Sequence, residues 1–319
     1  MTSSKAVPSL ASLLADSPTN WGRWGEDDEV GALNTITAAA VLDAAKEVQR
    51  GKVFTLGGQL ASGHDPVWPG RIQAERHNTR DRRDYVAGSA APSAGGLEFA
   101  DDEVRMALQG TTHVDALGHT WYDDRLYNGY PADTTAEGLD RASVLPLAER
   151  GVVTRGVLAD VARHLGKDAL EAGDLITLEQ LLSCLDAQGV EVSSGSALLV
   201  RTGVLGRLKR ENRPHPEEDY SEPGLSFSPE LVQWFRDQDI SCLATDTLGN
   251  EATNHPSGAA LLLHAGLMRN LGVVFCEVLE LDELADDCAE DSRYSFLYLA
   301  APLKVVRGTG APVNPVALK

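Results

Sequence analysis

Short apolar runs alternate with amphipathic segments along most of this chain. Leucines recur in 177–188 at the spacing of one helix face, which predicts a helix that begins at Thr177. Further helices are predicted at 38–50, 228–238 and 258–270. Strands are predicted at 53–60, 151–158, 197–202, 240–246, 273–279 and 294–306, and one more within 102–121. Because helices alternate with strands, the pattern indicates an α/β fold.

Two stretches lack such periodicity, and we expect both to be loops. Residues 61–100 are rich in glycine, proline, arginine and serine, and 203–227 is polar and contains prolines. The first stretch includes a basic segment from Arg71 to Arg83, either a solvated loop or a lid that meets an anionic group of a substrate. No internal repeat or low-complexity linker divides the chain. We therefore predict a flexible N-terminal segment, 1–20, and a single domain, 21–319.

Composition and charge exclude several classes of protein. The chain has 319 residues, of which 43% are hydrophobic, enough for a large core. Its net charge of −19 argues against nucleic acid and anionic membranes as partners. No apolar run is long enough to span a membrane, and the first residues lack the pattern of a signal peptide, so we expect a cytoplasmic protein. The four cysteines form no C-x-x-C pair, and Cys184, Cys242 and Cys276 are expected to be buried hydrophobes.

Residue types that bind metals are most concentrated between Gln109 and His119, where His113, Asp115 and His119 fall within a few residues. On a strand, His113 and Asp115 project from the same face, because side chains alternate. Gly118 allows a turn that brings His119 back toward them. Imidazole and carboxylate together suit Zn²⁺ or Mn²⁺. The alternative interpretation is a polar strand end with a hydrogen-bonded histidine.

Two distant residues are unusual for the elements that carry them. Glu277 lies in the apolar strand 273–279, where a carboxylate is costly unless it is paired or bound to metal; otherwise it reaches solvent at the strand end. His264 lies on the core side of the helix 258–270 and is either a hydrogen-bonded core histidine or a proton-transfer group. Asp246 and Glu251 follow a strand and either order the site or cap the next segment.

These residues resemble a known family. The run from Gln109 to His119 is similar to the H-x-G-T-H-x-D-x-x-x-H signature of the metal-dependent cyclase family, which includes bacterial kynurenine formamidase and isatin hydrolase. The segment 24–34, WGEDDEVGALN, and the tail 301–315 also resemble that family, and the resemblance extends over residues 20–317. It implies a mixed sheet with flanking helices in a swivelling β/α/β arrangement, and a homodimer or homotetramer.

The resemblance also implies roles for individual residues. His113, Asp115 and Glu277 would hold a catalytic divalent ion, Mn²⁺ or Zn²⁺. His119 would be a ligand of a second metal or a partner of the first ligands, and His264 the general acid/base. Gln109 stands where the family has its first histidine. Since an amide would bind a second metal more weakly, we expect one ion per subunit and doubt kynurenine formamidase activity itself.

The implied reaction is hydrolysis of an amide, lactam, lactone or ester of a small substrate by metal-activated water. Glu277 or His264 would take the proton of the water, and His264 or His119 would protonate the leaving group. Trp68, Trp121 and Tyr122 are candidates for lining an apolar pocket for a ring-bearing substrate. Two alternatives remain open: a biosynthetic cyclase or dehydratase that uses the metal as a Lewis acid, and a metal-binding protein without catalytic activity.

Overall fold

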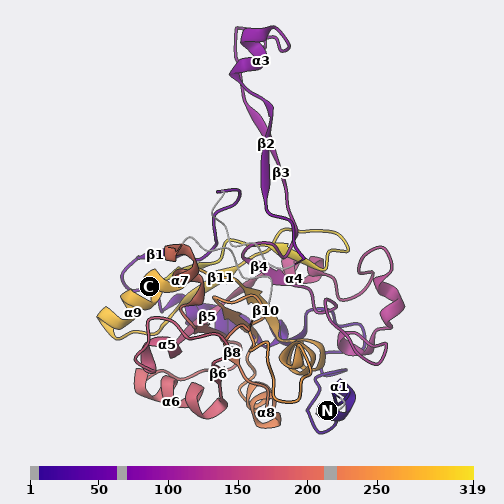
Figure 1. The fold of residues 1–319 in the computed structure, drawn as a ribbon, viewed down its shortest axis with the longest axis vertical. Coiled ribbons are helices and arrows are strands. Elements are labelled where there is room, and N and C mark those ends of the chain that lie inside the picture. Colours follow the sequence, from indigo (N-terminus) through magenta and orange to yellow (C-terminus); the bar gives the residue numbers. More distant parts are fainter. Residues whose placement is uncertain (1–6, 63–69, 212–220) are drawn as a thin grey trace, which may run out of the picture.

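The computed structural model describes residues 7–62, 70–211 and 221–319. Among these residues, nine strands form one mixed sheet in the order β1-β13-β11-β5-β7-β9-β10-β4-β12 (Figure 1). The strands of this sheet are β1 (Val53–Thr55), β4 (His113–Asp115), β5 (Val152–Asp160), β7 (Ala197–Arg201), β9 (Cys242–Thr245), β10 (Val274–Glu277), β11 (Ser295–Ala300), β12 (Gly310–Pro312) and β13 (Val316–Leu318). β5, β7, β9 and β10 run parallel, and antiparallel strands extend the sheet on both sides.

The remaining elements flank the sheet or project from it. The helical elements are α1 (Leu10–Leu13), η1 (Gly31–Thr35), α2 (Ala38–Ala45), α3 (Arg82–Ala87), η2 (Tyr127–Gly129), η3 (Ala132–Thr135), α4 (Val144–Arg150), α5 (Val161–His164), α6 (Leu178–Gln188), α7 (Val204–Glu211), α8 (Pro229–Asp237), the π-helix η4 (His264–Arg269) and α9 (Asp282–Asp291). Two small ladders pair β2 (Glu75–Arg80) with β3 (Asp101–Arg105) and β6 (Leu175–Ile176) with β8 (Gly224–Leu225). Within the described ranges, no helix has the length and apolar character needed to cross a membrane.

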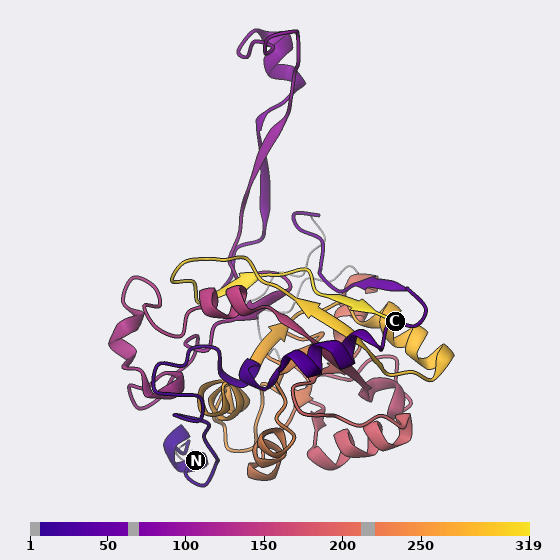
Figure 2. The ribbon, with the colours of Figure 1, turned by 180° about the vertical axis from the view of Figure 1, so that it is seen from behind.

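The predicted α/β class and mixed sheet are confirmed, and the central strands lie where the apolar runs indicate. β7, β9 and β10 are buried along their whole length, as expected for parallel strands that are covered on both faces. α2 packs across β5 and β11 and crosses the face toward the viewer in Figure 2. All four cysteines are buried and free, which agrees with the hydrophobic role predicted for three of them.

Sequence signals at both of its ends explain why α6 was predicted accurately. α6 begins after Thr177, whose side chain accepts from the backbone N–H of Gln180, while the Gln180 side chain bonds back to the N–H of Thr177. It ends at Gly189, which adopts a left-handed conformation. These are the capping box and the glycine stop that define helix ends.

Both loop predictions were wrong in part. Residues 61–100 contain β2 and α3, and with β3 these elements form a long two-stranded projection from the body (Figures 1 and 2). Its strands are exposed on both faces and therefore lack the apolar alternation by which strands are recognised. The stretch 203–227 contains α7, which buries only Val204 and Leu205. The segment is polar overall, which is why its composition resembled that of a loop.

Several predicted boundaries were also wrong. β4 is far shorter than the predicted strand in 102–121, whose first part belongs to β3. β1 ends at Thr55, and β11 ends at Ala300, shortly before Pro302, which cannot donate to a ladder. The helix predicted at 258–270 appears as η4, which starts later because the Glu251 carboxylate, rather than Ser257, accepts the first free backbone N–H groups.

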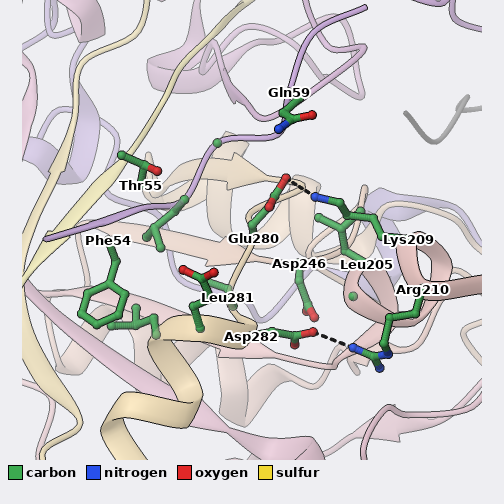
Figure 3. A pocket seen from close by; sticks show the side chains of 15 residues that line it. Phe54, Thr55, Gln59, Leu205, Lys209, Arg210, Asp246, Glu280, Leu281 and Asp282 are labelled. Atoms are coloured by element: carbon green, nitrogen blue, oxygen red, sulfur yellow. Dashed lines mark hydrogen bonds and ion pairs between the residues drawn. The ribbon is translucent and has the colours of Figure 1, made fainter. Parts of the chain in front are cut away.

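A cavity of about 380 Å³ opens where the parallel strands end (Figure 3). Its lining includes residues that follow β7, β9 and β10, among them Leu205, Asp246 and Leu281. Two ion pairs lie along it, Lys209–Glu280 at 2.6 Å and Arg210–Asp282 at 3.0 Å. The lining also contains Asp246 and Glu283, so acidic side chains outnumber the two cations.

Two glycines join the N-terminal segment to the turn between η4 and β10. The N–H of Ala32 donates to the carbonyl of Gly272 at 2.8 Å, and both Gly31 and Gly272 have positive φ, 60° and 72°. A Cβ on Gly31 would lie 2.8 Å from both the Gly272 Cα and the Leu117 Cδ1. A Cβ on Gly272 would lie 2.6 Å from Tyr127 Cε2. No side chain fits between these backbones.

We expect Gly31→Ala to lower the free energy of unfolding by about 2–4 kcal/mol, because it combines a left-handed backbone with a steric clash. Gly51→Ala is the matched control, since Gly51 has a φ of 66° but open space around its Cβ position. That control should lose only about 1–2 kcal/mol. Equal losses of the two variants in chemical denaturation would contradict the packing argument.

Candidate metal centre

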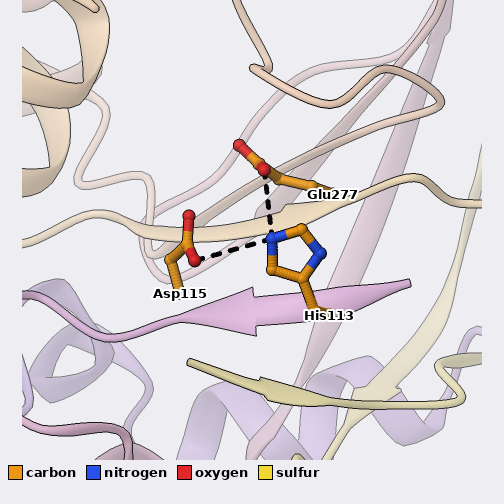
Figure 4. A group of neighbouring side chains, drawn as sticks. All are labelled: His113, Asp115 and Glu277. Carbon is orange, nitrogen blue, oxygen red and sulfur yellow. Dashed lines mark ion pairs between the residues drawn. The ribbon is translucent and has the colours of Figure 1, made fainter. Parts of the chain in front are cut away.

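Strand pairing brings three predicted ligands together on β4 and β10, close to one edge of the sheet. β4 and β10 are antiparallel, and Glu277 lies directly opposite His113. Paired residues share a face, and Asp115, two positions along β4, returns to that face. The three side chains therefore converge, although Glu277 is more than 160 residues away from His113 in the sequence (Figure 4).

The cluster is compact and almost completely shielded from solvent. The Nε2 atom of His113 lies 3.1 Å from Oε2 of Glu277 and 3.5 Å from Oδ1 of Asp115. One potential ligand atom from each residue lies within 4.8 Å of the other two. Relative exposure is 0% for His113 and 1% for both carboxylates. Two buried carboxylates beside one imidazole require a compensating positive charge.

The tautomer of His113 indicates what kind of charge the cluster accepts. Its Nδ1 lies 2.7 Å from the carbonyl oxygen of Thr111, which can only accept, so Nδ1 carries a proton. In the neutral ring, Nε2 then directs a lone pair toward the carboxylates. Among the residues that the structure describes, neither this Nε2 nor Oδ1 of Asp115 has a hydrogen-bond partner. A divalent cation would satisfy both atoms, and the histidine–carboxylate set fits Zn²⁺ or Mn²⁺.

The pKa values of His113 and Glu277 reflect the excess negative charge of the cluster. Burial disfavours the charged form of His113, but Asp115 and Glu277 outweigh burial and raise the pKa of the imidazole. Burial also opposes ionisation of Glu277, yet His113 and His264 lower its pKa to about 2. The surroundings thus favour a cation beside an ionised Glu277.

His264 approaches the cluster from η4 and is held by Glu251. Nδ1 of His264 lies 2.7 Å from Oε1 of Glu251, and the backbone N–H groups of Leu263 and His264 donate to the same carboxylate. Nε2 lies 3.5 Å from Oε1 of Glu277. Burial lowers the pKa of His264, but the bonds to Glu251 and Glu277 dominate and raise it to about 10. Of the two roles considered for Glu251, ordering the site and capping the next segment, the structure shows both.

Asp246, by contrast, lies outside the cluster and binds the backbone that joins β7 to α7. Its carboxylate accepts from the backbone N–H groups of Thr202 and Gly203, at 2.7 and 2.6 Å, and from the Thr202 hydroxyl. Burial raises the pKa of Asp246 to about 6, although these hydrogen bonds counteract the rise. It lines the cavity of Figure 3, whereas none of the three clustered residues does.

Asn250 is a site residue that the sequence analysis missed. It is fully buried, has a φ of 53°, and donates from Nδ2 to Oε1 of Glu277 at 3.3 Å. Its Oδ1 has no hydrogen-bond partner within the described part of the chain. The available signal was its place in a polar run just after β9, since ligands bind in α/β folds where parallel strands end.

Gln109 and His119 lie beside the cluster. Nε2 of His119 is 4.0 Å from Oδ2 of Asp115, and its side chain is 26% exposed. Gln109 donates from Nε2 to Oγ1 of Thr309 at 3.0 Å. A Cβ built on Gly310 would contact both Gln109 Nε2 and Asp115 Oδ1, so Gln109 flanks the same carboxylate. Their participation in metal binding stays a prediction.

The predicted aromatic lining is only partly described. Trp68 lies outside the described residues. Trp121 is 46% exposed. The Tyr122 ring packs against the guanidinium of Arg269, 3.8 Å from its carbon atom, and its hydroxyl bonds to Asn270. Tyr122 therefore anchors the segment that follows His119.

Comparison with known proteins agrees with this architecture. A family model described as "Putative cyclase" matches residues 54–252. A crystal structure described as a novel cyclase is 35% identical with a TM-score of 0.86, and the match covers 95% of this chain and 100% of that one. None of the curated proteins matches the chain significantly.

More distant structures share the fold at lower identity. Isatin hydrolase A from Ralstonia solanacearum is 21% identical with a TM-score of 0.61, covering 89% of this chain and 98% of its own. A protein described as a predicted metal-dependent hydrolase from Bacillus stearothermophilus is 18% identical with a TM-score of 0.50, covering 83% and 97%. At these identities the likeness concerns the fold alone.

We expect Mn²⁺ or Zn²⁺ to stabilise the protein against thermal unfolding, because a cation removes the repulsion between Asp115 and Glu277. At a metal concentration 100 times the Kd, the gain should be about 2.7 kcal/mol. Asp115→Asn should lose this gain, whereas Glu280→Gln, a partly exposed acid outside the cluster, should keep it. An equal response of both variants would show that the metal binds elsewhere.

A second prediction concerns Asn250. Asn250→Gly keeps the left-handed backbone without strain but removes the donor to Glu277, so the Kd for metal should rise about 10–100-fold. Calorimetric titration of the metal-free protein measures this change. Asn254→Gly, at an exposed position, serves as control. An unchanged Kd in Asn250→Gly would remove Asn250 from the site.

Proposed function

The chain belongs to the cyclase family, and on that premise we propose that it is a metal-dependent hydrolase of an amide, lactam, lactone or ester in a small, ring-bearing substrate. One observation carries the proposal. Nε2 of His113 and Oδ1 of Asp115 are buried 3.5 Å apart, and neither atom has a hydrogen-bond partner in the described residues. A divalent ion held by His113, Asp115 and Glu277 would lower the pKa of water toward neutrality and polarise a carbonyl group.

The residues around the cluster are arranged for proton transfer. Glu251 fixes the Nδ1 proton of His264, so Nε2 is the ring atom that exchanges a proton at the reacting centre. The same Nε2 is 3.5 Å from Glu277, which gives a short path between the two groups. A cation bound to Glu277 would offset the carboxylate charge that raises the pKa of His264. His264 could then accept a proton from the attacking water, directly or through Glu277, and return it to the leaving nitrogen or oxygen.

His119 and Asn250 complete the proposed arrangement. His119, being partly exposed, stands at the solvent side of Asp115 and is the second candidate for protonating the leaving group. Asn250 holds Oε1 of Glu277 with its Nδ2 and so keeps the carboxylate in one orientation. Isatin hydrolase A, which shares the fold, is a hydrolase by name, and this supports hydrolysis as the reaction class.

We expect His264→Ala to lower kcat/KM by about two to four orders of magnitude with the metal still bound, because a proton-transfer group is lost. A panel of N-formyl aromatic amines, lactams and lactones provides the assay. His164→Ala, in the distant helix α5, should leave activity unchanged. Turnover that is insensitive to His264→Ala would favour the non-catalytic alternative.

Reaction in ¹⁸O-labelled water distinguishes hydrolysis from the cyclase or dehydratase alternative. Hydrolysis places one labelled oxygen in the acid product, whereas cyclisation or dehydration places none there. Mass spectrometry of the product gives the answer. An unlabelled product would overturn the hydrolase proposal while leaving the metal site intact.

A further inference from the structure

Asn250 has a polar atom to which the arrangement above gives no role. The side chain is fully buried, and its Nδ2 donates to Oε1 of Glu277 at 3.3 Å. The other polar atom, Oδ1, has no hydrogen-bond partner among the residues that the structure describes. Leaving a buried acceptor without a donor is unfavourable, so this atom indicates a donor that arrives from outside the chain.

Glu277 determines which way the amide group of Asn250 faces. An ionised carboxylate only accepts hydrogen bonds, so Nδ2 must be the atom that faces Oε1. The opposite orientation would place two acceptors against each other. Because Oδ1 and Nδ2 are bonded to the same carbon atom, the unpartnered acceptor also lies beside the cluster.

The backbone on both sides of Asn250 is fixed. Buried Glu222 accepts from the backbone N–H groups of Leu248 and Gly249, at 2.7 and 3.0 Å. The next residue, Glu251, holds the start of η4. Asn250 itself has a φ of 53°, which asparagine tolerates better than most residues. The acceptor is therefore held in one place by its surroundings.

The two oxygens of Glu277 show on which side of the cluster this acceptor lies. Oε2 is 3.1 Å from Nε2 of His113, the metal side of the carboxylate. Oε1 is the atom that Asn250 binds, and it lies 3.5 Å from Nε2 of His264. Asn250 is thus on the same side as His264, where the proposed function has the leaving atom of the substrate receive its proton.

We propose that Asn250 is a specificity-determining residue whose Oδ1 accepts a hydrogen bond from the N–H of a scissile amide or lactam, an inference that rests on the proposed hydrolase function. An ester or lactone has an oxygen without hydrogen at this position, and an N-alkylated amide has no N–H. Both would leave Oδ1 unsatisfied. A site built to bind a substrate N–H rejects analogues that lack it.

The proposed contact is compatible with the reaction from substrate to product. The oxygen of water bonds to the carbonyl carbon, the C–N bond breaks, and the nitrogen keeps the electron pair of that bond. One proton of the water passes through His264 to this nitrogen, which gives a carboxylic acid and an amine. The original N–H stays on the nitrogen throughout, so its hydrogen bond to Asn250 need not break.

The test uses two series of compounds that differ at the leaving atom: formanilide, N-methylformanilide and phenyl formate, and isoindolinone, N-methylisoindolinone and phthalide. At saturating metal, Asn250→Gly should lower kcat/KM for the N–H compound by about tenfold or more beyond its effect on the ester or lactone. A loss that acts through Glu277 or the metal affects both compounds and cancels in this ratio. Asn254→Gly, at an exposed position, is the control and should leave the ratio unchanged.

Binding gives a readout that does not depend on turnover. In metal-loaded His264→Ala, calorimetric titration should give a Kd for the N–H compound about tenfold or more below that of its N-methyl derivative. Adding Asn250→Gly should remove the difference. The comparison of compounds needs no substitution at Asn250, so it holds even if Asn250→Gly folds poorly.

The outcomes separate this inference from the proposed reaction. Turnover confined to phenyl formate or phthalide, equal losses of kcat/KM across a series, or equal Kd values for the N–H and N-methyl compounds would overturn the role of Asn250 and leave the hydrolase proposal standing. Absence of turnover with every compound of both series would count against the hydrolase proposal and this inference together.

Discussion

The antiparallel pairing of β4 with β10 is the constraint on which the candidate site depends. It places His113 against Glu277 and returns Asp115 to the same face, so two carboxylates and an imidazole meet where water is excluded. Burying such charges is unfavourable unless a cation or a full set of hydrogen bonds compensates. The hydrogen bonds supplied by the described residues leave Nε2 of His113 and Oδ1 of Asp115 unsatisfied. The sheet therefore builds a site whose chemistry calls for a cation.

The surroundings of this cluster connect it to the rest of the fold. Glu251 caps the start of η4 and fixes the ring of His264 with the same carboxylate. One side chain therefore both stabilises the helix end and orients the histidine. π-helical turns such as η4 are often found at functional sites. The turn after η4 contacts the N-terminal segment through Gly31 and Gly272, where the two backbones approach closely. The tryptophan- and glycine-containing N-terminal motif thus supports the element that carries His264.

Much of this could be predicted from sequence, for reasons that particular residues make clear. The central strands are continuous apolar runs, and α6 carries both of its end signals, so local pattern was sufficient there. Glu277 was detectable because a carboxylate inside an apolar strand needs a partner. Asn250 was missed, and the sequence left open whether Glu251 caps a segment or orders the site, because the partners of both residues lie on other elements and no local spacing reveals them. The projection formed by β2, α3 and β3 was missed because exposed strands have no apolar alternation.

The sequence by itself determined the class of fold, the buried strands and the residue types that can hold a divalent ion, since these follow from hydrophobic periodicity and ligand chemistry. Tertiary structure alone decided which residues meet: the register of β10 on β4 places Glu277, rather than another acid, beside His113. It also decided that Asp246 binds the backbone between β7 and α7 while Glu251 orients His264. A register or a contact between distant elements is set by the packing of the whole sheet, and no short stretch of sequence contains that information.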